Sequence, residues 1–415
     1  MMETFLISKS KFSLVFVSIL MMSVAFGQTK IEGIHYQTKK PVSVEIKDGK
    51  IVCIEPLDKL TDEKHAYYIA PGLFDNQVNG YAGVSFTFSG KNFTVEGIKK
   101  VTQELWNRGV TSYLATVVTS SQEKLLKNFS ILNKAKNDTS LLGSLAGFHL
   151  EGPYISSIEG FRGSHLPEYI RNPNWNEFMA IYKASGRNIT TVTIAPELNG
   201  AIDFIRRCTE KGITVALGHL DASKEIIDEA VLNGAKTCTH LGNGCANMIN
   251  RHQNPLWPQL ANDQLMISII CDGFHLRDEE IATFYKVKGT EKTIITSDVT
   301  CFAGLPPGKY KDDDGETIEL TKEGMLRYPV QKVLYGSATP ITRGIVKIMN
   351  VTGCTLGDAI RMASTNPASL YGFTDRGKIV PGKRADLILF TIGEKELNIK
   401  RTYVNGILVF DAIKQ

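Results

Sequence analysis

GFHLEGPYIS (residues 147–156) is the stretch around which the chain is organised. The apolar run LLGSLAGFHL that leads into it predicts a buried strand, and Gly152 and Pro153 stop this strand directly after Glu151. A carboxylate at the end of a buried strand is costly unless a cationic group receives it. In parallel α/β proteins the strand ends are also where ligands bind. We therefore expect Glu151 to face a cation.

Two histidines occupy the equivalent place in other apolar runs. His219 ends the run ITVALGHL, and His240 ends the run AKTCTHL. One carboxylate and two imidazoles, each on a separate strand end, form the pattern of a catalytic zinc-type site with an open position for water. A single His at a strand end is more often a cap or a core hydrogen-bonding group, so the prediction depends on all three residues together.

Eight apolar runs between residues 70 and 300 predict strands, and helical patterns separate most of them. The predicted strands are 70–78, 110–119, 144–151, 189–197, 213–220, 236–242, 265–272 and 293–300. The predicted helices are 94–108, 121–137, 174–186, 200–211, 223–233, 277–288, 340–350 and 355–364. Eight strand–helix units with polar strand ends favour a closed (β/α)8 TIM-like barrel over a doubly wound sheet. The Gly/Pro-rich, acidic segment 301–336 is expected to be an active-site loop or hairpin.

The two ends of the chain have the pattern of antiparallel strands. Asp48-Gly49 and Asn405-Gly406 each join two apolar runs and predict hairpins. We expect residues 28–69 and 378–415 to pair in one small, β-sandwich-like domain that flanks a barrel of residues 70–377.

The first 27 residues predict a secretory signal peptide. Lys9 and Lys11 precede the apolar stretch FSLVFVSILMMSVAFG, and cleavage is expected after Gly27. The stretch is too short to favour a membrane span, although an uncleaved anchor is the alternative. The mature chain is therefore expected to be periplasmic or secreted, and cytoplasmic only if this segment is misread.

Charge and cysteine content exclude some classes of function. The net charge is +4 with no prominent Lys/Arg cluster, which argues against a nucleic-acid partner. The seven cysteines show no CxxC spacing and mostly lie in or beside apolar runs, so we expect core thiols.

Asp298 ends the eighth predicted strand, so closure of the barrel would bring it near the first strand. A carboxylate beside a metal-bound water can take its proton and deliver it to a leaving amine, which predicts amide hydrolysis. Gln77 and Asn79 follow the first strand; they would be weak amide ligands, and water-bridged or purely structural roles are equally compatible with the sequence. His149 lies on the same strand face as Glu151, where it could be a ligand, but a packing or supporting role is preferred.

At these motifs the chain resembles the amidohydrolase superfamily, and within it the N-acetylglucosamine-6-phosphate deacetylase family. The motifs are PGLFDNQVNGYAGVSF, HLEGPYIS, RGSH, GHLDAS, THLGN, DGFH, SDVTCFAG, NPASLYG and GKIVPGKRADLILF, and they extend over nearly the whole chain after the signal peptide. The resemblance implies a (β/α)8 barrel with a small β domain from both termini. It also implies a homodimer that deacetylates an N-acetylated amino sugar.

The resemblance assigns roles to individual residues. It implies that Glu151, His219 and His240 bind one divalent ion, expected to be zinc, and that Asp298 is the catalytic acid/base. Gln77 and Asn79 stand where many members carry an HxH pair for a second metal. The positions implied to contact substrate are Ser164, His165, Asn243, Gly244, Arg251, His275, Leu334, Tyr335 and Gly336.

The sequence departs from the family pattern in ways that leave the substrate open. THLGNGCANM reshapes the pocket wall, and the run after Arg251 differs from the family's. A signal peptide favours an unphosphorylated N-acetylated sugar, because sugar phosphates are mainly cytoplasmic. The alternatives are another amidohydrolase that acts on N-acyl amino acids or cyclic amides, and a non-catalytic binding protein on the same scaffold.

Overall fold

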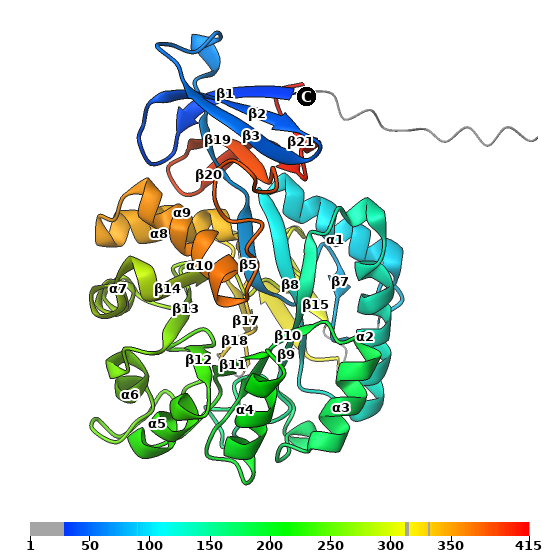
Figure 1. Ribbon diagram of the computed structural model, residues 1–415. Helices are drawn as coiled ribbons and strands as arrows, with labels where there is room; N and C mark the ends of the chain where they lie inside the picture. The colour runs from blue at the N-terminus through cyan, green and yellow to red at the C-terminus, as the bar shows by residue number, and fades with distance from the viewer. Residues whose placement is uncertain (1–28, 89, 312–314, 331–332, 415) are drawn as a thin grey trace, which may run out of the picture.

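A computed structural model describes residues 29–88, 90–311, 315–330 and 333–414 of the chain. The predicted signal peptide lies outside the described residues. Figure 1 shows a barrel surrounded by helices, with a smaller sheet at one end that contains both ends of the described chain. None of the described helices is both long and apolar enough to cross a membrane.

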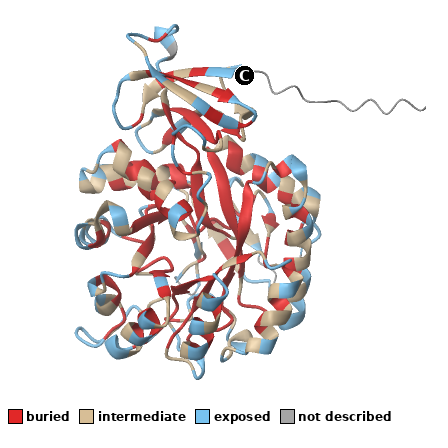
Figure 2. Cartoon of the chain, in the orientation of Figure 1, coloured by how far each residue is buried: buried red, intermediate tan, exposed pale blue. Residues whose placement is uncertain are grey.

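Eight parallel strands form the barrel, and they follow one another in chain order. They are β5 (Leu73–Val78), β8 (Val110–Val118), β9 (Leu145–Glu151), β10 (Ile189–Ile194), β11 (Thr214–Leu217), β12 (Ala235–Cys238), β13 (Met266–Ile270) and β14 (Thr293–Thr296). Each overlaps one of the eight predicted strands, so the barrel prediction is confirmed. Figure 2 shows these strands buried while the surrounding helices expose their outer faces, as a barrel core requires.

The barrel closes between β5 and β14 with few backbone hydrogen bonds. A single parallel bridge joins Val78 to Val299, and the Asn79 amide donates to the Val299 carbonyl at 2.7 Å. Lower in the same seam the Asp75 carboxylate accepts from Thr296 Oγ1 at 3.3 Å, from the Ser297 amide at 3.2 Å, and from the Ser297 hydroxyl. Side-chain hydrogen bonds therefore join much of this seam, whereas regular backbone hydrogen bonds join the other neighbouring strands of the barrel.

Ten helices are described, and most begin at a residue suited to capping. They are α1 (Val95–Asn107), α2 (Gln122–Lys136), α3 (Trp175–Ala184), α4 (Ala201–Glu210), α5 (Lys224–Leu232), α6 (Leu256–Ala261), α7 (Asp278–Lys292), α8 (Ile341–Thr352), α9 (Leu356–Met362) and α10 (Thr365–Leu370). The hydroxyls of Thr94, Ser121 and Ser223 accept from the first turns of α1, α2 and α5. The sequence patterns did not predict α6 and α10, because six residues that include a proline show no helical period.

The chain ends meet in one seven-stranded sheet, in the order β21-β20-β19-β4-β1-β2-β3. Its strands are β1 (Thr29–His35), β2 (Pro41–Lys47), β3 (Lys50–Pro56), β4 (Tyr68–Pro71), β19 (Leu387–Ile392), β20 (Leu397–Val404) and β21 (Ile407–Asp411). Both predicted hairpins are present, and the β4–β19 pair joins the two ends of the chain. In Figure 1 the blue and red strands accordingly lie side by side.

The first predicted barrel strand, 70–78, is in fact two strands. β4 belongs to the terminal sheet and β5 to the barrel, and Gly72 lies between them. A Cβ atom at Gly72 would lie 2.1 Å from Thr111 Oγ1, so only glycine allows the chain to pass this closely between the sheets. The apolar run is continuous in the sequence, and therefore its hydrophobicity gave no sign of this break.

Segments that follow β5 and β14 add small sheets beside the barrel. β6 (Gly80–Tyr81) and β7 (Val84–Ser85) form a hairpin, and β15 (Gly308–Lys311), β16 (Thr317–Leu320), β17 (Leu326–Tyr328) and β18 (Val333–Leu334) form an antiparallel sheet in the segment expected to be a loop or hairpin. This sheet has its own apolar cluster, in which Phe302 and Tyr335 pack with Ile318. Three 3-10 helices complete the fold, at Glu63–His65, Thr139–Leu141 and Pro167–Tyr169.

Candidate metal and catalytic site

Glu151, His219 and His240 converge at the carboxyl ends of the barrel strands. Glu151 Oε1 lies 2.8 Å from His240 Nε2 and 3.3 Å from His219 Nε2. All three side chains are nearly inaccessible to solvent. The structure therefore brings together the three residues that the sequence singled out as ligands.

The hydrogen bonding of His219 indicates a need for positive charge at this point. Its Nδ1 donates to the Phe161 carbonyl at 2.9 Å, so in a neutral imidazole the lone pair of Nε2 faces the anionic Glu151 oxygen. That contact is favourable only if Nε2 carries a second proton or a metal cation lies between the two atoms. One oxygen and two nitrogens are ligands that suit a divalent ion. The donor set thus fits a metal.

The backbone at three site residues is strained. His219, His240 and Asp298 have φ values of +53°, +28° and +52°, in the left-handed region that residues with a side chain rarely adopt. Each of them lies two residues beyond the end of a barrel strand, namely β11, β12 or β14. Such conformations persist where the surrounding structure holds them, and they cluster at functional sites.

Burial and mutual contact shift the protonation of the ligand set. Burial alone would raise the pKa of Glu151, but contact with the His219 and His240 imidazoles holds it well below its usual range. Burial likewise disfavours the charged form of His240, yet the Glu151 carboxylate outweighs burial and raises the pKa of His240. Glu151 therefore stays ionised at neutral pH and attracts a cation.

His165 is a fourth side chain at the same point. A ring nitrogen of His165 and ligand atoms of Glu151 and His219 all lie within 4.8 Å of one another. Its Nδ1 is 2.7 Å from Thr119 Oγ1, and its ring meets the His219 ring at a centroid distance of 4.4 Å. Burial, with the nearby His219 charge, lowers the pKa of His165 to about 3, so it is neutral.

Two histidines can supply the third ligand. A tetrahedral ion with bonds of about 2.1 Å places its ligand atoms about 3.4 Å apart. Glu151 Oε1 lies 3.3 Å from His219 Nε2 and 2.8 Å from His240 Nε2, and His165 forms a group with Glu151 and His219 whose ligand atoms all lie within 4.8 Å of one another. His165 is also close enough to contact a bound substrate.

Asp298 faces this cluster from the seam between β14 and β5. Its Oδ1 accepts from Asn79 Nδ2 at 2.7 Å. Burial and the Glu151 charge raise the pKa of Asp298 to about 7, although His240, His275 and Asn79 oppose them. A carboxyl group with this pKa can both accept and return a proton near neutral pH.

Gln77 and Asn79 are in direct contact with the two carboxylates of the site. Gln77 Nε2 donates to Glu151 Oε2 at 3.0 Å, on the side of the carboxylate away from the histidines, while Asn79 binds Asp298. Neither contact involves a water bridge, which was one of the roles that the sequence left open. The amides thus act as hydrogen-bond donors to both carboxylates.

Four of the positions expected to contact substrate lie close to the site residues. A Cβ at Gly244 would lie 2.6 Å from His219 Nδ1, and one at Gly336 would lie 3.2 Å from the Asp298 carbonyl oxygen, so both glycines permit close packing. Asn243 has a buried Nδ2 with no hydrogen-bond partner among the described residues. His275 Nδ1 is fixed by Asp272 Oδ2 at 2.7 Å, which leaves its Nε2 for another group.

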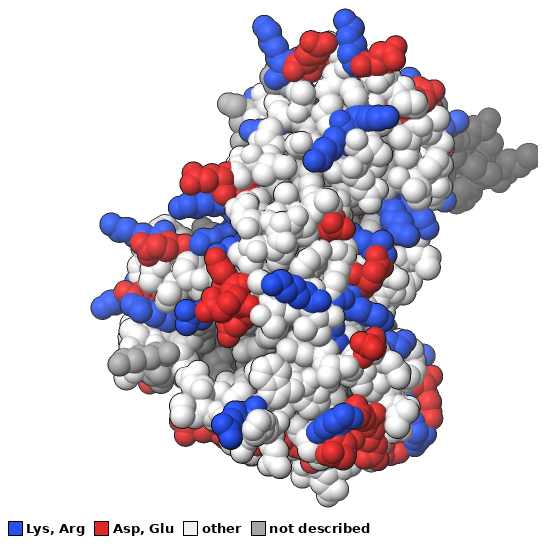
Figure 3. Space-filling model, turned by 90° about the vertical axis from the view of Figure 1, so that its left-hand side faces the viewer, with Lys and Arg blue, Asp and Glu red and all other residues white. Residues whose placement is uncertain are grey.

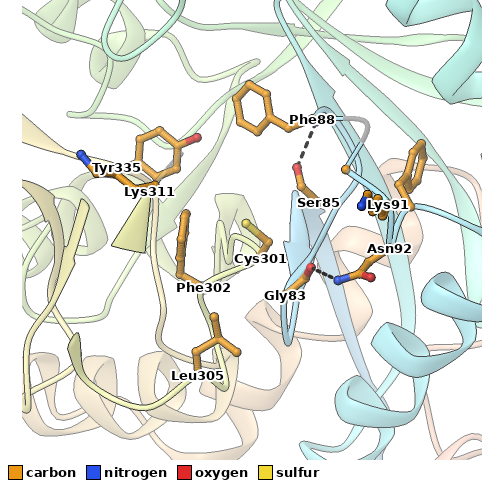
Figure 4. A pocket seen from close by; sticks show the side chains of 12 residues that line it. Gly83, Ser85, Phe88, Lys91, Asn92, Cys301, Phe302, Leu305, Lys311 and Tyr335 are labelled. Atoms are coloured by element: carbon orange, nitrogen blue, oxygen red, sulfur yellow. Dashed lines mark hydrogen bonds between the residues drawn. The ribbon is translucent and has the colours of Figure 1, made fainter. Parts of the chain in front are cut away.

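Four other expected positions are less closely tied to the site. Ser164 and Arg251 are exposed, and within the described chain the Arg251 side chain makes no hydrogen bond or ion pair. Tyr335 lines a cavity of about 190 Å³ together with Phe88 and Phe302. Figure 4 shows this cavity between the segments that follow β5 and β14, and Leu334 is not among its lining residues.

Several supporting groups were not predicted from the sequence. They are the Thr119 hydroxyl behind His165, the Phe161 carbonyl behind His219, and the Ser268 hydroxyl, which accepts from the His240 amide at 2.9 Å. A backbone carbonyl has no signal in a sequence, and isolated Thr and Ser residues on strands are common. His149 was expected to pack below the site, and it does so between Thr116 and Thr193, with ring nitrogens 3.3 and 2.7 Å from their hydroxyls.

This fold and site define a class of protein. The model of the amidohydrolase family matches residues 68–409, and the chain belongs to that family.

More specific similarities lie within one branch of the family. The chain is 32% identical over 388 residues to the N-acetylglucosamine-6-phosphate deacetylase of Rattus norvegicus, covering 88% of this chain and 91% of the relative. It is 29% identical to the enzyme of the same name from Vibrio furnissii, covering 93% and 94%. Among solved structures, N-acetylglucosamine-6-phosphate deacetylase from Thermotoga maritima superposes with a TM-score of 0.80 at 28% identity, covering 92% of this chain and 100% of the other.

Proposed function

We propose that the protein is a metal-dependent hydrolase that removes the acetyl group from an N-acetylated amino sugar. The observation that carries the proposal is a pair of carboxylates on one barrel rim. Glu151 is held ionised against two imidazoles, and the pKa of Asp298 is raised to about 7. The relatives named above are amino-sugar deacetylases, and they cover most of the chain.

Glu151, His219 and His240 would hold one divalent ion, which we propose is zinc. When bound there, the ion would lower the pKa of a water molecule and polarise the amide carbonyl. Zinc suits a site with one carboxylate and two imidazoles, in which a fourth position stays open. His165 lies beside the ligands as a neutral imidazole, so it is placed to donate a hydrogen bond to the carbonyl oxygen of the substrate.

Asp298 would carry the proton through the reaction. It accepts a proton from the attacking water, and it returns this proton to the amine nitrogen as the C–N bond breaks, so that acetate and a free amino sugar result. Asn79 fixes Oδ1 of Asp298 at 2.7 Å and leaves Oδ2 for this exchange. Burial keeps bulk water from competing for the proton.

We propose N-acetylglucosamine-6-phosphate, or the corresponding unphosphorylated sugar, as the substrate. The names of the relatives support the phosphorylated form. The predicted signal peptide supports the unphosphorylated form, because it would export the chain to the periplasm or beyond. Within the described part of the chain no group binds His275 Nε2 or Asn243 Nδ2, so both can form hydrogen bonds to the hydroxyl or anionic groups of either sugar.

We also propose a homodimer with no nucleic-acid partner. On the face drawn in Figure 3 the Lys/Arg and Asp/Glu side chains are interspersed, without the extended basic patch that nucleic acid requires. Exposed Arg251, Met248 and Trp257 belong to one segment before and at the start of α6, and a subunit contact there would cover them.

A substrate panel tests the proposed function. Release of acetate and of free amine is measured for phosphorylated and unphosphorylated N-acetylglucosamine, for N-acyl amino acids and for a cyclic amide. We expect turnover of an N-acetyl sugar that depends on the metal and on Asp298. Turnover of only N-acyl amino acids or cyclic amides would assign the chain to another amidohydrolase activity, and ligand binding without any turnover would indicate a binding protein.

A further inference from the structure

The carboxyl end of β5 donates side-chain hydrogen bonds to both carboxylates of the site. Gln77 Nε2 reaches Glu151 Oε2 at 3.0 Å, and Asn79 Nδ2 reaches Asp298 Oδ1 at 2.7 Å. In each case the amide takes one oxygen of the carboxylate. The other oxygen is left for the reacting groups: Glu151 Oε1 contacts the two histidines, and no donor among the described residues binds Asp298 Oδ2.

The alternation of side chains along β5 places both amides on the face of the site. Gln77 and the next-but-one residue, Asn79, bind Glu151 and Asp298, while Asn76 between Asp75 and Gln77 faces the other way and binds the Tyr371 hydroxyl at 3.0 Å.

The surroundings of Asn79 add a second observation. Its carbonyl oxygen Oδ1 is buried and has no hydrogen-bond partner among the described residues. The backbone amide of the same residue donates to the Val299 carbonyl at 2.7 Å, which fixes the residue across the barrel seam from Asp298. A rigidly held amide can therefore fix Asp298 with its N–H and offer its oxygen to a water molecule at the site.

We propose that Asn79 and Gln77 are positioning residues, each of which fixes one oxygen of a site carboxylate so that the other oxygen is directed at the reacting groups. Asn79 orients the proton-transfer group Asp298, and Gln77 orients the metal-binding group Glu151. The inference rests on the deacetylase function proposed above. It gives the Gln77-Val78-Asn79 stretch a defined role in a site that holds one metal.

Substitution of Asn79 tests the orientation of Asp298. Asn79→Asp keeps the shape but removes the donor, whereas Asn79→Ala removes both. We expect each variant to lose about 10–100-fold in kcat with KM nearly unchanged, and Asn79→Asp to be at least as impaired as Asn79→Ala, because the new carboxylate faces Asp298. A role in packing alone predicts the reverse order. Wild-type kcat in Asn79→Asp would overturn the assignment of Asn79.

The effect of substituting Gln77 is measured as a change in metal affinity rather than in activity. Gln77→Met keeps the length of the side chain and removes its donor. Equilibrium dialysis against Zn²⁺, with metal analysis of the protein, should show affinity about 10–100-fold below that of the wild type. Affinity equal to that of the wild type in a folded Gln77→Met protein would overturn the assignment of Gln77.

Asn76→Ala is the matched control for both variants. Asn76 is on the same strand and also donates its side-chain N–H, but to Tyr371 rather than to a carboxylate. We expect a lower melting temperature with kcat and Zn²⁺ affinity close to those of the wild type. The wild type and Asp298→Asn are assayed in parallel. A wild type without deacetylase activity rejects the proposed function, whereas an active wild type with unaffected Asn79 and Gln77 variants rejects only the positioning role.

Discussion

Glu151 and Asp298 are two carboxylates on one barrel rim whose surroundings drive their pKa values in opposite directions. Both are buried, and burial alone would raise each pKa. At the end of β9 the imidazoles of His219 and His240 reverse that effect and hold the pKa of Glu151 well below its usual range. At the β14–β5 seam the negative charge of Glu151 adds to burial and raises the pKa of Asp298 to about 7.

The opposite pKa shifts indicate a different role for each carboxylate. A permanently ionised carboxylate against two imidazoles suits cation binding, and a carboxyl group that titrates near neutral pH suits proton transfer. The same side-chain chemistry therefore serves two roles because of its position around the barrel. The predictions below test this division of roles, beginning with the largest expected effect.

Asp298→Asn should separate proton transfer from metal binding. We expect kcat to fall by about 10²–10⁴-fold, the usual contribution of a positioned general acid or base, while the bound metal is retained. Steady-state kinetics together with metal analysis measure both quantities. Equal turnover in the variant and the wild type would remove Asp298 from the mechanism.

Substitution of His240 and of His165, whose rings both pack against His219, tests which side chains bind the metal. His240→Ala is expected to weaken Zn²⁺ binding by about 100-fold or more, beyond what loss of a supporting group causes. His165→Ala should keep the metal and lose kcat or raise KM. Metal titration of both purified variants decides; metal loss in His165→Ala alone would make His165 the third ligand.

Asp75 offers a stability test of the seam that carries Asp298. Burial raises the pKa of Asp75 to about 6 in spite of its hydrogen bonds from Ser297 and Thr296. The folded protein therefore keeps a proton that the unfolded chain releases, and stability falls as pH rises from about 4 to 6. The fall should amount to about 3 kcal/mol for a shift of this size.

The measurement compares urea unfolding of the wild type and of Asp75→Asn between pH 4 and pH 8. The difference in unfolding free energy between the two proteins should change through this window and be flat above it. A difference that does not depend on pH would show that Asp75 keeps an ordinary pKa in the folded protein.

A substitution in the terminal sheet should change the stability of the protein without changing its catalysis. Ile69 in β4 is fully buried and pairs with Leu389 in the terminal sheet, outside the barrel. Ile69→Val is expected to lower the unfolding free energy by about 0.5–1.5 kcal/mol, with kcat and Zn²⁺ affinity unchanged. A change in kcat at equal metal content would mean that the terminal sheet affects the site.

The sequence predicted the repeated strands and their end residues well. It did not show where a continuous apolar run divides into two strands. Periodic hydrophobicity located all eight barrel strands, and the motif positions of Glu151, His219, His240 and Asp298 proved to be neighbours in space. The break at Gly72 was not predicted, because β4 and β5 are both apolar. The short α6 and α10 were also not predicted, because they complete less than two turns.

Local chemistry along the chain by itself determined the fold class, the hairpins at both ends and the identity of the residues at the strand ends, because period, turn residues and strand breakers act over a few neighbours. Only the tertiary structure decided that Gln77 binds Glu151, that Asn79 binds Asp298 and that the Phe161 carbonyl fixes the His219 ring. These contacts join residues that barrel closure and loop packing bring together. Their distances and their effect on each pKa depend on burial and geometry, which no single stretch of sequence contains.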